Sequence, residues 1–501
     1  MSNIKKLASA TMWYGVSSIA ARFLNYLLTP YITNQNSISK ADYGKMTLVY
    51  ATISFLNILF TYGMETTYFR FNKQGEEGKS VYSTISISLF VTTLIFSFFL
   101  LNNIQSLATI AGVGDLPILI NISIFIIAFD TLSVLPFSKL RQDSRPIKFA
   151  LAKVLGILVN ILFTLFFVSY CPNALNQNAN SWVGVIYNPN RSAIEYILWA
   201  NLIQSIFTFL LLLKEALAIK LQFNFTLWKQ MMQYSWPLII VGVGAMINET
   251  FSRQMLNWWQ DGTTEFKNEQ VGIFNACYKL SILITLFIQA FKMGAEPFFF
   301  KQAEAGNPQK TYARVMKFFV IVITTMFLAV ALFLPIWKHF IGPKYWSGLS
   351  IVPILLLANM FLGIYYNLSI WFKLGNKTTA GLMITLVGSA ITLIINYLFI
   401  PKFGFIACAW ATFFCYGGMM VLSYIWGQKV YPIPYKWKKL VAYFVIVIAL
   451  FFVQKLIILF WDNAIFSIAI GVFLLLVYVR FLLLVEKNEF KKLPVIGKFI
   501  K

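Results

Sequence analysis

Four basic residues lie inside apolar segments that are long enough to cross a membrane. Arg22 and Arg253 are separated by 231 residues, and Arg22 stands close to the middle of its segment. Lys45 and Lys279 are separated by 234 residues. A charge at the centre of a spanning helix costs at least about 2.5–3.5 kcal/mol on insertion scales, so such residues face a water-filled cavity or an ionic partner. Because arginine suits phosphate oxygens and lysine adds a point charge, the pattern predicts a cationic site for an anionic substrate.

Two acidic residues lie deepest in the predicted spans, and they offer a second interpretation. Glu249 stands four residues before Arg253 and could neutralise it along one helix face. Asp130, midway through another span, could pair with Arg22. Intramembrane carboxylates also carry H⁺ or Na⁺ in coupled transport. Structural ion pairing and ion coupling both stay open for these two acids.

The elements that must position these residues are membrane helices. The chain of 501 residues is 59% hydrophobic and only 12% charged, with a mean hydropathy of +0.71. This composition predicts an all-α polytopic membrane protein, and about fourteen apolar segments reach the length that crosses a bilayer. The expected spans are 8–32, 40–65, 80–102, 116–138, 148–170, 194–213, 233–256, 271–293, 316–337, 348–371, 379–400, 405–427, 440–460 and 463–485.

The basic residues outside these spans fall mainly in alternate loops. About 29 lie in one set of loops and at the two ends of the chain, against about 7 in the other set. This asymmetry predicts that both termini are cytoplasmic. The net charge of +23 is therefore explained by topology and by contact with anionic membrane lipids, and it predicts no nucleic-acid partner.

The chain repeats itself weakly at an offset of about 231 residues. Residues 63–71 read GMETTYFRF and residues 294–301 read GAEPFFFK, which aligns Glu65 with Glu296. We expect these two glutamates to act as structural clamps at helix ends. Several matches at nearly one offset indicate two related halves, and six spans in each half make them parallel.

The repeat predicts a domain organisation. Its parts are an N-terminal lobe over 1–222, a C-terminal lobe over 223–428, and two further helices with a basic cytoplasmic tail over 429–501. Parallel lobes of this kind commonly enclose a central site. Tyr26 is a candidate for stacking on a sugar ring in that cavity.

The sequence gives no support for an enzyme. His339 is the single histidine, the four cysteines have no paired spacing, and neither a phosphate-binding loop nor a dinucleotide-binding fingerprint is present. We therefore expect no catalytic residue, no cofactor and no metal site.

Local motifs then resemble a known family. They are Asp42-Tyr43-Gly44 before the second span, Gly63 with Arg70-Phe71 after it, and the opening Ser9–Trp13. With fourteen spans, the chain resembles the polysaccharide-biosynthesis flippases (O-antigen and exopolysaccharide) of the multidrug/oligosaccharidyl-lipid/polysaccharide exporter superfamily.

The resemblance implies translocation of undecaprenyl-diphosphate-linked oligosaccharide across the bacterial cytoplasmic membrane by alternating access. Arg22 and Arg253 would hold the diphosphate or acidic sugars, while the lipid tail stays in the bilayer. Polysaccharide polymerase machinery is a partner that the resemblance leaves open.

Two other transport functions stay open. A lipid II flippase would use nearly the same chemistry. A multidrug and toxin extruder resembles the same two lobes, but it typically has twelve spans and exports organic cations, which a basic cavity would repel.

Overall fold

The computed structural model describes residues 19–20, 22–72, 76–178, 181–302, 308–375, 377–461 and 463–491. These residues form helices and turns and include no strand, which confirms the predicted all-α class. Twelve described helical segments are long and apolar enough to cross a membrane, and each overlaps one predicted span. They are Lys40–Phe71, Ser80–Leu101, Ile118–Gln142, Pro146–Gln177, Ala193–Leu211, Thr264–Met293, Pro308–Ala331, Pro343–Leu374, Thr379–Phe403, Phe405–Val430, Trp437–Phe460 and Ala464–Val485.

The other two predicted spans are not among these twelve segments. The first, 8–32, lies mostly outside the described residues, whose helix in this region continues to residue 34. The seventh, 233–256, belongs to a continuous helical stretch formed by α11 (Phe225–Met246), the π-helical turn η3 (Ile247–Phe251) and α12 (Ser252–Trp259). This stretch carries several polar residues, so it is less apolar than the other spans.

The helices group into two compact units. Unit 1 contains residues 1–275 and 389–408, and unit 2 contains residues 276–388 and 409–501. Besides α11, η3 and α12, unit 1 holds α2 (Lys40–Thr61), α3 (Met64–Phe71), α4 (Glu76–Leu101), α5 (Ile104–Ile110), α6 (Ile118–Gln142), α7 (Pro146–Leu165), η1 (Phe166–Tyr170), α8 (Cys171–Gln177), η2 (Trp182–Val185), α9 (Ala193–Leu211) and α10 (Leu213–Ala216).

Unit 2 holds the remaining helices. They are α14 (Pro308–Ala331), α15 (Leu334–Trp337), η4 (Lys338–Phe340), η5 (Pro343–Ile351), α16 (Val352–Leu368), α17 (Ile370–Leu374), α20 (Trp437–Phe460), α21 (Ala464–Val485) and α22 (Lys487–Phe490). Three long helices contribute residues to both units: α13 (Thr264–Gln302), α18 (Thr378–Phe403) and α19 (Phe405–Val430).

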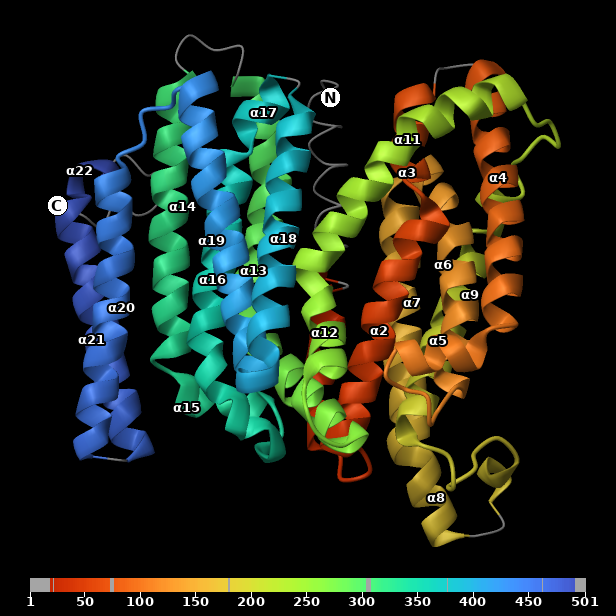
Figure 1. Cartoon of the computed structure of the whole chain (residues 1–501), viewed down its shortest axis with the longest axis horizontal. Helices are drawn as coiled ribbons and strands as arrows, with labels where there is room; N and C mark the ends of the chain where they lie inside the picture. Colours follow the sequence, from red (N-terminus) through yellow and green to blue (C-terminus); the bar gives the residue numbers. More distant parts are fainter. Residues whose placement is uncertain are drawn as a thin grey trace. The chain divides into compact units, whose positions relative to one another are not determined.

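Helix α6 is central to unit 1. It packs against α2, α4 and α9, and α9 packs in turn against α7 (Figure 1). Its apolar side chains are interrupted by serines, whose hydroxyls donate to the carbonyl four residues earlier. For Ser123 this carbonyl belongs to Leu119, at 2.6 Å, and for Ser133 it belongs to Phe129, at 2.8 Å. Such bonds satisfy the hydroxyls within the helix and leave its surface small enough for close packing.

Helices α2 and α13 meet backbone to backbone inside unit 1. A Cβ atom on Gly44 would lie 1.8 Å from the carbonyl oxygen of Asn268. A Cβ atom on Gly272 would lie 2.3 Å from the carbonyl oxygen of Lys40. The contact is reciprocal, because each glycine faces the residue four positions before the other glycine. Only glycine permits this approach.

Two ion pairs in unit 1 join helices that are distant in the sequence. Arg141 of α6 pairs with Glu65 of α3 at 2.9 Å. Lys40 of α2 pairs with Glu269 of α13 at 3.0 Å. Each pair therefore holds one helix against another within this unit.

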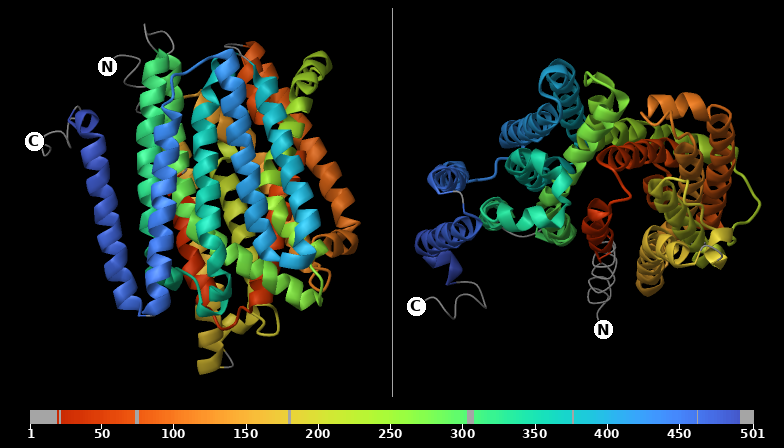
Figure 2. Two further views of the ribbon diagram at one scale, coloured as in Figure 1. Left: turned by 60° about the vertical axis from the view of Figure 1, so that its left-hand side comes forward. Right: turned by 90° about the horizontal axis from the view of Figure 1, so that it is seen from below.

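Unit 2 is organised around α14, which packs against α16, α20 and α21. Figure 2 shows α20 and α21 as a pair of long helices at the edge of this unit. Directly after α21, the carboxylate of Glu486 is 3% exposed and accepts hydrogen bonds from Lys439, Lys317 and Tyr443 at 2.7, 3.0 and 2.6 Å. This buried carboxylate ties the last two spans to α14.

Candidate functional site

A group of charged residues gathers inside unit 1, on α3, α6, α7 and the helix that precedes α2. Lys153 of α7 lies within electrostatic range of Asp130, Glu65, Arg22 and Arg141, and Asp130 acts on it most strongly. We call these five residues the charge cluster. It holds three cations and two acids, so its formal charge is positive. Its members come from segments far apart in the sequence, and the packing of α6 against α3 and α7 brings four of them together.

Accessibility differs among the members of the charge cluster. The side chain of Arg22 is exposed, whereas Asp130 and Lys153 are partly buried. The Lys153 ammonium lies 4.3 Å from the centre of the Phe137 ring, and Asp130 lies beside Ser205 of α9. The aromatic ring and the carboxylate stabilise the lysine charge away from bulk water. Chemically, the cluster can receive an anion at Arg22 while Asp130 balances Lys153.

The structure places Tyr26 one helical turn after Arg22, where its side chain is buried. Its ring stacks on Phe23, with 6.4 Å between ring centres. The predicted role of Tyr26 in sugar stacking is untested by this arrangement.

Arg253 lies in a different part of unit 1, at the start of α12. It is 7% exposed, and its Nη1 donates to the backbone carbonyl of Glu249 at 2.8 Å, while its Nε donates to Oδ1 of Asn275 at 3.1 Å. The guanidinium also lies 5.7 Å from the centre of the Phe274 ring. Arg253 is thus held in a packed polar network, and the Glu249 side chain is exposed.

The two predicted lysines occupy separate places. Lys45 forms an ion pair with Asp115, in the loop between α5 and α6, and its side chain is 14% exposed. Lys279 lies on the part of α13 that belongs to unit 2, where it is partly buried. Of the predicted substrate-binding residues, the charge cluster therefore includes Arg22 and does not include Lys45 or Arg253.

The predicted helix-end clamps have different outcomes. Glu65 pairs with Arg141 rather than with the nearer Arg70, whose guanidinium lies 4.4 Å from the centre of the Tyr234 ring. The side chain of Glu296 lies outside the part of the chain that the structure describes.

Sequence reasoning missed two members of the charge cluster. Lys153 stands close to the expected cytoplasmic end of its span, which suggests a lysine that reaches toward the membrane surface. Arg141 is one of many basic loop residues. The only sequence signal for Lys153 is Asp130, an acid in the middle of the preceding helix. The two residues can be recognised as partners only when the packing of these helices is known.

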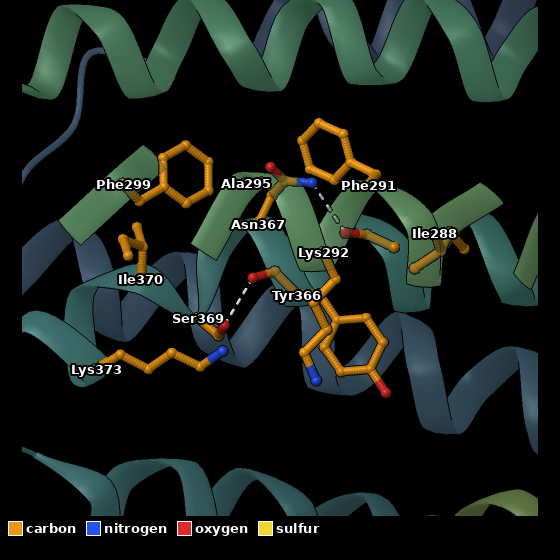
Figure 3. Close-up of a pocket in the computed structure, with 11 residues that line it drawn as sticks. Ile288, Phe291, Lys292, Ala295, Phe299, Tyr366, Asn367, Ser369, Ile370 and Lys373 are labelled. Atoms are coloured by element: carbon orange, nitrogen blue, oxygen red, sulfur yellow. Dashed lines mark hydrogen bonds between the residues drawn. The ribbon is translucent and has the colours of Figure 1, made fainter. Parts of the chain in front are cut away.

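Unit 2 contains a small pocket between α13 and the α16–α17 region, with a volume of about 10 Å³, or room for one water molecule. Figure 3 shows Lys292 and Lys373 beside Tyr366, Asn367 and Ser369. The Lys292 ammonium lies 4.7 Å from the centre of the Tyr366 ring. Asn367 donates to the Gly363 carbonyl at 3.2 Å, and Ser369 donates to the Tyr366 carbonyl at 2.6 Å. Among the described residues, no three His, Cys, Asp or Glu side chains gather as metal ligands would.

Comparison with known families decides the class of the chain. A family model described as "Polysaccharide biosynthesis protein" matches residues 7–303, which is more than half of the chain. The chain belongs to the polysaccharide biosynthesis protein family. Comparison with curated proteins found no match.

Solved structures share the fold of this polysaccharide biosynthesis protein. It is similar to the lipid II flippase MurJ in an inward closed conformation, with a TM-score of 0.73, 15% identity, and coverage of 95% of this chain and 99% of the other. An inward-facing multidrug resistance MATE transporter of the MOP superfamily matches with a TM-score of 0.60 and 13% identity, over 84% of this chain and 97% of the other. An outward-facing MATE transporter matches with a TM-score of 0.53, 13% identity, and coverage of 84% and 95%.

These findings confirm the predicted family. The chain has the fold of multi-pass membrane transporters and flippases. The predicted count of about fourteen spans is consistent with the twelve described spans, the α11–α12 stretch and the partly described first helix.

Proposed function

We propose that this protein translocates undecaprenyl-diphosphate-linked oligosaccharide from the cytoplasmic to the outer leaflet of the bacterial cytoplasmic membrane, for surface polysaccharide biosynthesis. The observation that carries the proposal is the charge cluster. An exposed arginine and a partly buried lysine lie within electrostatic range of each other on helices of a chain in the polysaccharide biosynthesis family. Cations of this kind fit a phosphate-bearing cargo and repel the organic cations of a multidrug extruder.

In this proposal Arg22 makes the first contact with the diphosphate. Its guanidinium offers paired donors to two phosphate oxygens, and Lys153 adds a positive charge behind it. Asp130 offsets the positive charge of Lys153 when the site holds no substrate, and protonation of Asp130 would strengthen the pull on the anion. Asp130 is therefore the better candidate for H⁺ or Na⁺ coupling, since the exposed carboxylate of Glu249 lies outside the charge cluster.

The other predicted residues take secondary roles. We propose that Arg253, Lys45 and Lys279 contribute positive potential along the path of the cargo, and that Tyr26 becomes a sugar-stacking residue only after a rearrangement. The lobes over 1–222 and 223–428 would alternate access between the two leaflets, with the termini in the cytoplasm. Related folds adopt inward-facing and outward-facing conformations, which supports such a cycle.

The experiment is a leaflet-resolved analysis of lipid-linked glycans in cells that lack the protein and are complemented with variants. Arg22→Ala removes a charge-assisted contact worth about 1.5–3 kcal/mol, so we expect transport to fall roughly 10- to 100-fold. Arg22→Lys should recover part of this loss. Lys402→Ala, at an exposed end of α18, is the matched control and should transport normally.

Accumulation of diphosphate-linked oligosaccharide in the cytoplasmic leaflet supports the proposal when native protein relieves it and a normally expressed Arg22→Ala does not. Full rescue by Arg22→Ala would remove Arg22 from the site. Unchanged lipid-linked glycans in the deletion strain would refute the function itself.

A lipid II flippase is the second candidate. The observation that favours it is the TM-score of 0.73 to a lipid II flippase over 95% of this chain. The same leaflet analysis separates the two, because a lipid II flippase would cause lipid II, rather than a polysaccharide repeat unit, to accumulate on the cytoplasmic side.

A further inference from the structure

The segment between α10 and α11, residues 217–224, exposes large apolar side chains, and we call it the cover segment. Its exposed apolar residues are Leu217, at 68%, Leu221, at 89%, and Phe223, at 45%. Three exposed lysines lie within or beside it: Lys214, Lys220 and Lys229. Exposed apolar groups interspersed with lysines are typical of a chain that lies in the interface of an anionic membrane.

The cover segment is fixed to the outside of α4. The backbone N–H of Lys220 donates to the Ser83 hydroxyl at 2.9 Å, and that of Asn224 donates to the Thr84 hydroxyl at 3.2 Å. Just before the segment, the Glu215 carbonyl accepts a hydrogen bond from the Tyr82 hydroxyl at 2.6 Å. Three successive residues of α4 thus hold the segment and the residue before it in place.

A pocket of about 460 Å³ lies beneath the cover segment, entirely within unit 1. Its walls are formed by α4, α6 and α9, and they include Leu89, Phe90, Leu132 and Leu135. The volume falls within the range of roughly 300–1,000 Å³ that is usual for ligand pockets. Pro136 also lines the pocket, and as a proline inside α6 it cannot donate to the Leu132 carbonyl, which loosens the helix at this wall.

The walls are almost wholly apolar, and the segment that covers them carries or adjoins three exposed lysines. The hydroxyl of Tyr82, one of the few polar groups in the wall, is already bonded to the Glu215 carbonyl. Phe90 is 51% exposed, and Leu94 and Ile95 further along α4 are 55% and 58% exposed, as expected of a surface that faces lipid. A ligand here needs a long hydrocarbon chain, and the lysines favour an anionic headgroup attached to it.

We propose that this pocket holds one acyl chain of an anionic glycerophospholipid, whose phosphate contacts the lysines beside the cover segment. This site is separate from the charge cluster and does not depend on the proposed transport function. The proposed occupant is a membrane lipid that stays bound to the protein. The alternative occupant is the hydrocarbon tail of the transported lipid-linked oligosaccharide.

The test uses the full chain in nanodiscs that contain phosphatidylglycerol with a photoreactive group at the end of one acyl chain. After irradiation, labelled peptides are mapped and quantified. We expect label to concentrate at least fivefold on residues 82–90, 132–136 and 216–223 relative to the exposed faces of α20 and α21. Phosphatidylcholine carrying the same chain should label these residues less.

Leu132→Trp fills the pocket and should remove most of this label, whereas the matched control Leu94→Trp, on the exposed face of α4, should leave it unchanged. Replacing Lys214, Lys220 and Lys229 together by glutamine should abolish the preference for phosphatidylglycerol. If the label is distributed uniformly over all lipid-facing helices of the native chain, the proposal is overturned, and this result does not rely on any variant. Displacement of the label by undecaprenyl diphosphate at equal concentration would overturn the assigned occupant.

Discussion

Replacing Glu486 by glutamine is expected to destabilise the protein by about 3 kcal/mol, the lower end of the range for breaking a buried ion pair. Glutamine keeps the shape of the side chain but removes the charge that two lysines share. The side chain of Lys317 is only 12% exposed, and it would keep one acidic neighbour, Glu489, at 3.4 Å. Lys439 is 32% exposed and can be hydrated again, so the loss of its ion pair with Glu486 adds little to the destabilisation. The expected change in the unfolding equilibrium is about 100-fold.

The lowered pKa of Glu486 determines how the stability difference between the native protein and E486Q changes with pH. Burial alone would raise the pKa of Glu486, but hydrogen bonds from Lys439, Tyr443 and Lys317 outweigh burial and hold the pKa below its ordinary value. A carboxyl group with a lowered folded pKa stabilises the protein above its unfolded pKa of about 4.3, and this stabilisation is lost as pH falls through the folded pKa. The stability gap between native and E486Q protein should therefore be full at pH 7 and should shrink below about pH 4.

The assay is equilibrium unfolding in detergent micelles, followed by circular dichroism at several pH values. Glu489→Gln is the comparison variant, because Glu489 is 27% exposed and its nearer partner, Arg314, is 43% exposed. Lys317 would lose only the longer of its two contacts, at 3.4 Å, and would keep Glu486 at 3.0 Å. An exposed pair of this kind contributes about 0–1 kcal/mol. An E486Q variant that is no less stable than E489Q, or a gap that does not respond to pH, would refute the buried-charge reasoning.

Three further perturbations follow from contacts in unit 1. Gly44→Ala forces α2 away from the Asn268 carbonyl and should lower the free energy of unfolding by about 1–3 kcal/mol. The control Gly184→Ala should leave thermal stability unchanged, because its Cβ would meet only an ordinary contact at 3.6 Å. Glu215→Gln should cost about 1–2 kcal/mol, less than E486Q in the same unfolding assay, because its two cationic partners are 30% and 44% exposed and can recover water. Asp130→Asn removes the balancing charge of the charge cluster, so the native dependence of transport on pH should flatten; an unchanged pH profile in the leaflet assay would contradict ion coupling at this residue.

The spans could be predicted because apolar length is a local property of the sequence. The partners of the charges could not, since they depend on which helices pack together. Lys45 illustrates this: its partner Asp115 lies 70 residues later, in a loop, and no spacing rule connects them. Lys153 is similar, because its position near one end of a span conceals that α6 presents Phe137 and Asp130 to it.

Arg253 shows a different limit of sequence periodicity. A spacing of four residues predicts that the carboxylate of Glu249 faces it on a regular α-helix. Glu249 instead lies in the π-helical turn η3, whose wider turn changes the helical register. The arginine therefore bonds to the Glu249 backbone carbonyl. Hydropathy and residue spacing do not reveal a π turn, so only the structure could identify this contact.

The reciprocal contact of Gly44 and Gly272 has an evolutionary consequence. When each of two segments meets the same relative position of the other, the geometry is that of a twofold interface between identical subunits. A half-length ancestor carrying this glycine would have been able to meet its own copy through the same crossing. Gene fusion would then have preserved a homodimer contact inside one chain. The residues around each glycine would have been able to diverge, whereas neither glycine could be replaced by a larger residue.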